Sequence, residues 1–178
     1  MFCLSEEIYN VHVKSKGAGG LLITIIVGEP GTGKTSYALK VAKEVYKELG
    51  YNDPWTHAVQ HTFVTFQQYG EWSKKMLEKY KKWAEGGCKE KYEKTPVIVI
   101  DDLFGQQLDR YGWREKQVQS FSAIFNMIRS LTSAVLLTTP VRAFNSFPVA
   151  VEQSLMRHMC HLNFFYFQFF PSCCAVSR

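Results

Sequence analysis

A continuous apolar run followed at once by a glycine-rich turn constrains the fold of this chain more than any other feature. Residues 21–27, LLITIIV, are almost all apolar or β-branched, which is typical of a strand buried on both faces. Residues 28–36, GEPGTGKTS, follow directly, and residues 35–49 have the spacing of an amphipathic helix that stops at Gly50. The sequence therefore predicts a strand, a tight loop and a helix in immediate succession.

The loop fits the GxxxxGKT pattern of a phosphate-binding loop in its required setting between a strand and a helix. Its glycines allow successive backbone N–H groups to face an anion, and the helix adds the positive end of its dipole. Lys34 is expected to reach the outer phosphates, and Thr35 to place its hydroxyl on Mg²⁺. The residues expected to bind the nucleotide are Gly28, Glu29, Pro30, Gly31, Thr32, Gly33, Lys34, Thr35 and Ser36. The alternative is a glycine-rich turn without a ligand.

Two acids follow a further buried strand, which is expected at residues 97–100. Ligands of open α/β sheets bind outside the carboxyl ends of the strands, so these acids would meet the phosphate loop. Asp101 is the expected Mg²⁺ partner, through water, and Asp102 could polarise the water that attacks the γ-phosphate. The alternative is that both are ordinary turn-forming aspartates.

A pair of hydroxyls ends the next expected strand, residues 134–138, in the run LLTTP. If that strand lies beside the first one, Thr139, or else Thr138, could sense the γ-phosphate or position the attacking water. The alternative is a β-branched strand end followed by a turn at Pro140.

Strands and helices alternate along the whole chain, which indicates an α/β fold with a mostly parallel sheet covered on both faces. Other strands are expected at residues 61–66 and 162–170, and helices at residues 69–85, 115–131 and 148–159. We expect an N-terminal arm with one short strand and a glycine-rich joint at 1–20, an ATPase domain at 21–170, and a tail at 171–178.

GEPGTGKT, IDD and TTP in this order resemble the AAA+ branch of the additional-strand P-loop ATPases, and most closely its replication-initiator and helicase-loader group. The resemblance covers residues 20–170 and implies a three-layer α/β/α fold whose five-stranded sheet has the order 5-1-4-3-2. It also implies ATP hydrolysis, often in a homo-oligomeric ring in which a neighbour supplies an arginine. Arg157 matches the usual position of that arginine, and Arg142 is the substitute candidate.

One departure concerns the helical lid with which an AAA+ core normally continues, because this chain ends eight residues after Phe170. The core therefore also resembles compact, lidless ATPases of viruses and plasmids, including DNA-packaging motors and DNA translocases. Those commonly carry a glutamine on the fourth strand, where this chain has threonine. The aromatic run at residues 163–170 is expected to be covered by a neighbouring subunit or by the N-terminal arm.

Together these features predict Mg²⁺-dependent ATP binding and hydrolysis that drives work on DNA or on a DNA-bound protein. Two other classes stay open: a small-molecule kinase on the same loop, and a nucleotide-gated interaction module that does not hydrolyse ATP. The lysine-rich segment 71–94 either contacts nucleic acid or forms an ordinary solvated face. The loop 103–115 either moves with the nucleotide state or is a rigid surface loop.

Composition sets the remaining bounds. The 178 residues, 46% of them hydrophobic and 21% charged, suit one globular domain. The longest apolar run is about seven residues, far short of the ~20 that span a bilayer, so no membrane partner is expected. The N-terminus lacks the pattern of a secretory signal, and we expect an intracellular, cytoplasmic protein. A net charge of +5 permits a nucleic-acid partner without requiring one.

Overall fold

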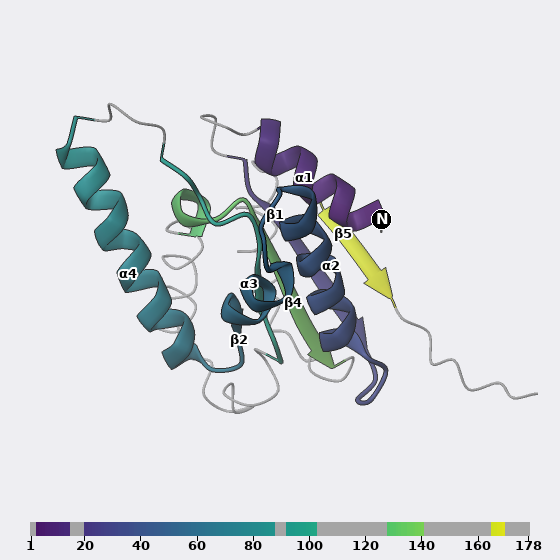
Figure 1. The fold of residues 1–178 in the computed structure, drawn as a ribbon. Coiled ribbons are helices and arrows are strands. Elements are labelled where there is room, and N and C mark those ends of the chain that lie inside the picture. Colours follow the sequence, from purple (N-terminus) through teal and green to yellow (C-terminus); the bar gives the residue numbers. More distant parts are fainter. Residues whose placement is uncertain (1–2, 15–19, 88–91, 103–127, 141–164, 170–178) are drawn as a thin grey trace, which may run out of the picture.

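A parallel sheet organises the part of the chain that the structure describes, residues 3–14, 20–87, 92–102, 128–140 and 165–169. The computed structural model has five strands in the order β2-β3-β4-β1-β5, and every pairing is parallel (Figure 1). The strands are β1 (Leu22–Gly28), β2 (Thr62–Phe63), β3 (Ile98–Ile100), β4 (Ala134–Pro140) and β5 (Phe165–Phe169). The predicted α/β class and strand order 5-1-4-3-2 are confirmed.

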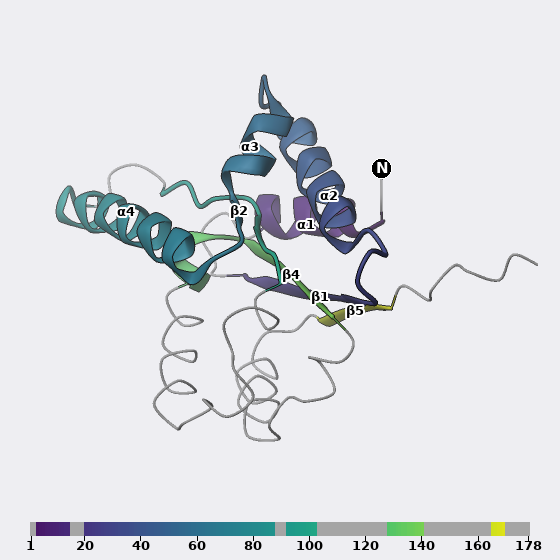
Figure 2. The same ribbon diagram turned by 90° about the horizontal axis from the view of Figure 1, so that it is seen from below.

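The described helices surround this sheet unevenly. They are α1 (Cys3–Lys14), α2 (Lys34–Glu48), α3 (Pro54–Gln60) and α4 (Phe66–Glu85). Figure 2 shows α1, α2 and α3 together on one side of the sheet, while α4 stands beside the edge formed by β2. Among these helices none is both long enough and apolar enough to cross a membrane.

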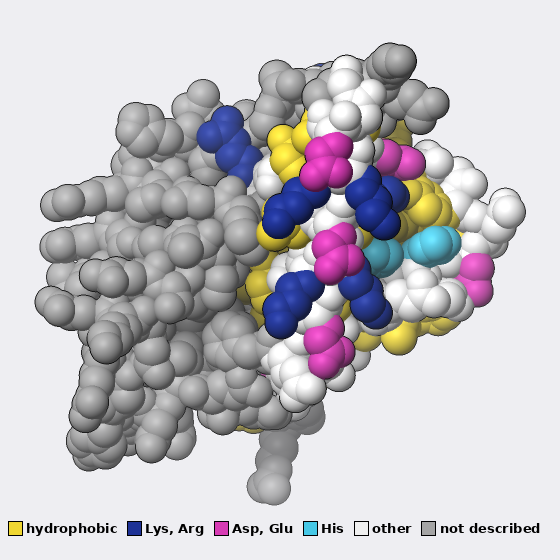
Figure 3. All heavy atoms as spheres, turned by 90° about the vertical axis from the view of Figure 1, so that its left-hand side faces the viewer, with side chains coloured by type: hydrophobic (Ala, Val, Ile, Leu, Met, Phe, Trp, Pro, Cys, Tyr) yellow, Lys and Arg dark blue, Asp and Glu magenta, His cyan; other side chains and the backbone are white. Residues whose placement is uncertain are grey.

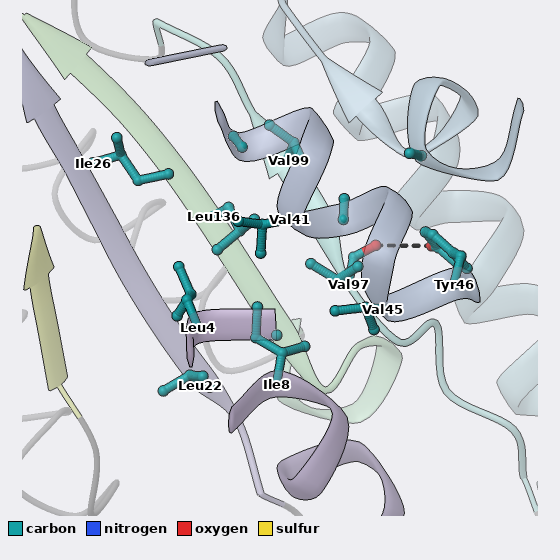
Figure 4. Close-up of a cluster of buried hydrophobic side chains, with 14 residues drawn as sticks. Leu4, Ile8, Leu22, Ile26, Val41, Val45, Tyr46, Val97, Val99 and Leu136 are labelled. Atoms are coloured by element: carbon teal, nitrogen blue, oxygen red, sulfur yellow. Dashed lines mark hydrogen bonds between the residues drawn. The ribbon is translucent and has the colours of Figure 1, made fainter. Parts of the chain in front are cut away.

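The core lies between the sheet and the helices α1 and α2. Leu4 and Ile8 of α1 and Val41 of α2 pack with strand residues such as Ile26 and Leu136 (Figure 4). Tyr46 also links α2 to the residue before β3, because its hydroxyl donates to the main-chain carbonyl of Val97 at 2.9 Å. Burial of these apolar side chains holds the helix that follows the phosphate loop against the strands that carry the predicted site.

The other face of the sheet is buried as well. Ile23 and Ile25 of β1 and Leu137 of β4 point to that face and are almost fully buried. Both faces are therefore covered, as the continuous apolar runs predict. Of the two helices predicted at 115–131 and 148–159, residues 128–131 are helical, and the other residues lie outside the part of the chain that the structure describes.

The prediction of a short strand in the N-terminal arm was wrong, because residues 3–14 form the helix α1. Leu4, Ile8 and Val11 recur at intervals of four and three residues, so one helical face carries all three. Leu4 and Ile8 enter the core, and Val11 packs against it. Burial of this face outweighs the local β-propensity of Val11 and Val13. The division of the chain at residue 20 stays a prediction.

The segment between α2 and α4 also differs from the prediction. The strand expected at 61–66 is only Thr62–Phe63, because Thr65 and Gln68 form a capping box that starts α4 at Phe66. Helix α3 was not predicted, although its start signal is present: Asp53 caps it and a proline follows.

Candidate functional site

The predicted phosphate loop occupies the turn between β1 and α2, at the carboxyl edge of the sheet. Gly33 is the N-cap residue of α2 and has a φ of 84°, in the left-handed region that favours glycine. The backbone N–H and the hydroxyl of Thr32 both donate to the carbonyl of Glu29, at 3.3 and 2.8 Å. Lys34 Nζ donates to the same carbonyl at 2.8 Å. The lysine therefore folds back over its own loop, on the side of the helix N-terminus.

Gly28 is required here by close approach. A Cβ atom at this position would lie 2.8 Å from Thr32 Oγ1 and 3.4 Å from Lys34 Cδ. The first distance is shorter than van der Waals contact allows, so a side chain would displace the Thr32 hydroxyl, which donates to the carbonyl of Glu29. Of the other predicted loop residues, Glu29, Pro30, Gly31 and Ser36 are exposed to solvent. The loop thus presents an open backbone surface to a ligand.

Asp101 joins the loop to the end of β3. Thr35 Oγ1 donates to Asp101 Oδ1 at 2.7 Å, across 66 residues of sequence. Thr138, at the end of β4, donates to the same oxygen at 2.5 Å. The backbone N–H of Asp101 donates to the carbonyl of Phe63 in β2 at 2.9 Å. Three strands and the first turn of α2 therefore fix the position of one half-buried carboxylate.

Asp102 lies immediately beside this carboxylate and has an unusual backbone. Its φ is 45°, the only positive value among the described residues other than glycine. Its backbone N–H donates to Thr138 Oγ1 at 2.9 Å. Aspartate is one of the few residues that adopt the left-handed region without severe strain. The structure thus brings Thr35 to Asp101, with Lys34 and Asp102 as their neighbours in sequence, and the roles of these four residues stay predictions.

The two threonines of LLTTP have different surroundings. Thr138 contacts both acids, whereas Thr139 points to the opposite face of β4, since side chains alternate along a strand. Among the described residues, the Thr139 hydroxyl makes one long contact, donating to the carbonyl oxygen of Pro140 at 3.4 Å. Of the two hydroxyls, that of Thr138 is the one in contact with the acids of the site. The role of Thr139 stays a prediction. The register of β4 against β1 and β3 decides which of the two threonines faces the acids, and the sequence pattern could not show this.

The Thr35 hydroxyl and the Asp101 carboxylate are hard oxygen ligands, the kind that Mg²⁺ takes from proteins at phosphate sites. The hydrogen bond between them shows that both can face one point. This donor set fits a magnesium ion held together with the phosphates of a nucleotide. Within the described ranges no cluster of three or more His, Cys, Asp or Glu side chains forms a separate metal site.

Several predicted features lie outside the described residues. These are Arg157 and Arg142, the loop 103–115, and residues 163, 164 and 170 at the ends of the aromatic run, whose residues 165–169 form β5. Their assignments stay predictions.

Comparisons with known proteins place this site in a wider group. The model of the family "novel STAND NTPase 3" matches residues 22–163. The uncharacterized protein B-251 of Sulfolobus spindle-shape virus 1 is 35% identical over 139 residues, which are 77% of this chain and 49% of the relative. The uncharacterized protein ORF286 of Acidianus two-tailed virus is 30% identical over 139 residues, 76% of this chain and 41% of the relative. The chain therefore spans less than half the length of these two relatives.

Among solved structures, the fold is similar to a crystal structure of the DnaC helicase loader. The likeness covers 91% of this chain and 86% of that chain, with 20% sequence identity and a TM-score of 0.45. It is too distant to bear on function.

The family match extends over most of the chain and contains every residue of the site described above. It includes the phosphate loop, the acids that follow β3 and the threonines that end β4. The resemblance of these motifs to P-loop ATPases is thereby confirmed. The chain belongs to the novel STAND NTPase 3 family.

Proposed function

We propose that this protein binds and hydrolyses ATP with Mg²⁺, and that hydrolysis drives work on DNA or on a DNA-bound protein. The hydrogen bond from Thr35 to Asp101 is the observation that carries the proposal. It joins the phosphate loop to the acid-bearing end of β3, which supports a nucleotide site built from both segments. Membership of an NTPase family supports the same reading.

Each part of the site has a distinct task in this proposal. The backbone N–H groups of the loop and the N-terminus of α2 bind the phosphates, and Lys34 neutralises their outer charge. Thr35 and Asp101 would hold Mg²⁺, which supplies charge stabilisation at the transferring phosphoryl group. Asp102 orients the attacking water and accepts its proton. Thr139, or else Thr138, was predicted from the sequence to assist this step, and of the two it is Thr138 that contacts both acids.

The DNA-directed output rests on the motif resemblance and on the basic net charge of +5. Helix α4 does not add to it. Lysines and glutamates are interspersed on the exposed face of α4, which is typical of a solvated helix (Figure 3). A homo-oligomeric ring with an arginine from a neighbour, Arg157 or Arg142, is part of the same proposal.

The direct test is ATP hydrolysis by the wild type and by Asp102→Asn, with and without single- and double-stranded DNA. Asparagine keeps the size of the side chain and tolerates a left-handed backbone, so it removes little besides the carboxylate. We expect Asp102→Asn to bind ATP with unchanged affinity and to lose hydrolysis by roughly 10²- to 10⁴-fold. DNA should stimulate the wild type.

Lys34→Ala is the control for a contaminating ATPase, because it should lose both binding and turnover. If the wild type and Asp102→Asn bind ATP equally and neither hydrolyses it under any condition, the enzymatic proposal is wrong. The protein would then be a nucleotide-gated interaction module. Stimulation by a small acceptor molecule instead of DNA would identify a kinase.

A further inference from the structure

The hydroxyl of Thr138 stands between the two acids of the site. It donates its proton to Asp101 Oδ1 and accepts the backbone N–H of Asp102 at 2.9 Å. A hydroxyl carries a single proton. Because that proton is directed at Asp101, the side chain cannot donate to a phosphate in this arrangement. Thr138 is thus placed to hold Asp101 and the backbone of Asp102 in position, and not to sense the nucleotide.

The backbone at Asp102 needs such a support. A φ of 45° is uncommon for any residue other than glycine, and surrounding contacts must maintain it. The backbone N–H of Asp102 is anchored by Thr138, and the preceding N–H, of Asp101, is anchored by the carbonyl of Phe63. Both strands that flank β3 therefore hold the turn at which the chain leaves it.

We propose that Thr138 is a positioning residue, whose hydroxyl fixes the left-handed backbone of Asp102 and thereby sets the direction of the Asp102 carboxylate. This inference rests on the proposed function, in which Asp102 orients the attacking water. The neighbouring Thr139 cannot take this role, since its side chain points to the other face of β4.

The first experiment measures amide hydrogen exchange at Asp102 by NMR in the nucleotide-free protein. Thr138→Val should speed exchange of this amide by about tenfold, and Thr138→Ser should leave it as in the wild type. Thr24→Val is the matched control: Thr24 lies buried on the same face of the sheet, but its hydroxyl has no hydrogen-bond partner in the described structure. Rapid exchange of the Asp102 amide in the folded wild type would overturn the proposal, even if Thr138→Val failed to fold.

The second experiment separates kcat from KM for ATP. Thr138→Val should lower kcat by at least tenfold with KM within about threefold, because a misdirected base slows the chemical step but leaves the phosphate loop intact. Thr138→Ser should restore kcat. In the Asp102→Asn background the same change should have no further effect, because both act through one group.

Two results would contradict the inference. Restoration of kcat in Thr138→Val by excess Mg²⁺ would place the effect at Asp101 alone. Effects of Thr138→Val and Asp102→Asn on kcat that multiply in the double variant would show that the two residues act independently. A wild type without ATPase activity would remove the proposed function, while the exchange experiment would still test the backbone anchor.

Discussion

At the scale of single residues, the conformation of the phosphate loop depends on Gly33. Alanine at this position would meet no atom within 4 Å, so its cost is the strain of a φ of 84°. We expect Gly33→Ala to lower the free energy of unfolding by roughly 1–2 kcal/mol and to weaken ATP binding. Urea denaturation and nucleotide titration measure the two effects.

Gly70 provides the matched control for this substitution. It lies within α4, has no positive φ, and a Cβ there would also meet nothing within 4 Å. Gly70→Ala should therefore raise the free energy of unfolding by roughly 0.5–1 kcal/mol. Equal changes in the free energy of unfolding for the two substitutions would show that the left-handed backbone of Gly33 does not cause the loss of stability.

At Thr24 in β1 we predict a substitution that stabilises the fold. Its hydroxyl is completely buried and has no hydrogen-bond partner among the described residues. Valine has almost the same shape and removes the unsatisfied group, so Thr24→Val should raise the free energy of unfolding by about 1 kcal/mol. Thermal or chemical denaturation would show this. A loss of stability would mean that the hydroxyl has a partner after all.

At the scale of elements, α4 depends on the capping box at its N-terminus. Thr65 Oγ1 accepts the backbone N–H of Gln68 at 3.2 Å, and Gln68 Oε1 accepts the backbone N–H of Thr65 at 3.2 Å. Thr65→Ala should lower the free energy of unfolding by about 1 kcal/mol, whereas Thr65→Ser should keep most of it. Equal stability of the alanine and serine variants would rule out a role for the cap.

Which elements could be predicted depended on how local their signals were. The strand at β1, the loop and α2 were predicted nearly to the residue, since periodicity and helix-stop signals lie within each segment. α1 was not predicted, although Leu4, Ile8 and Val11 have helical spacing, because the β-propensity of Val11 and Val13 favours a strand locally and contact with the core selects the helix. β2 was predicted too long, because the capping box of α4 takes the residues that follow it.

At the scale of the whole molecule, an aromatic cluster joins α2, α3, β2 and α4. Tyr46 stacks on His57 and His61, and His61 meets Trp72 edge-on, with ring centroids 5.6, 5.7 and 6.5 Å apart. Burial lowers the pKa of His61 below its usual value, and the charge of His57 acts in the same direction. The hydrogen bond from His61 Nδ1 to the His57 carbonyl opposes them only partly.

This lowered pKa predicts a pH dependence of stability. Below about pH 6.5 the unfolded chain takes up a proton at His61 that the folded protein does not. The free energy of unfolding should therefore fall as the pH drops through this range, by less than about 1.4 kcal/mol per pH unit for one proton. Urea unfolding between pH 7.5 and 5.5 measures it. In His61→Gln the slope should be smaller, and an unchanged slope would assign it to other groups.

The sequence by itself determined the chemistry of the site and the class of the fold. A phosphate loop and an acid at a strand end are local requirements of backbone geometry and charge, so a short stretch is enough to specify each. Tertiary structure alone decided that Thr138 contacts Asp101, that Asp102 has a left-handed backbone, and that the N-terminal arm is a helix in the core. Strand register is the physical reason for the first, since a shift of one residue turns every side chain to the other face. The other two depend on contacts between segments far apart in the sequence, which maintain the backbone of Asp102 and select the helix over a strand in the N-terminal arm.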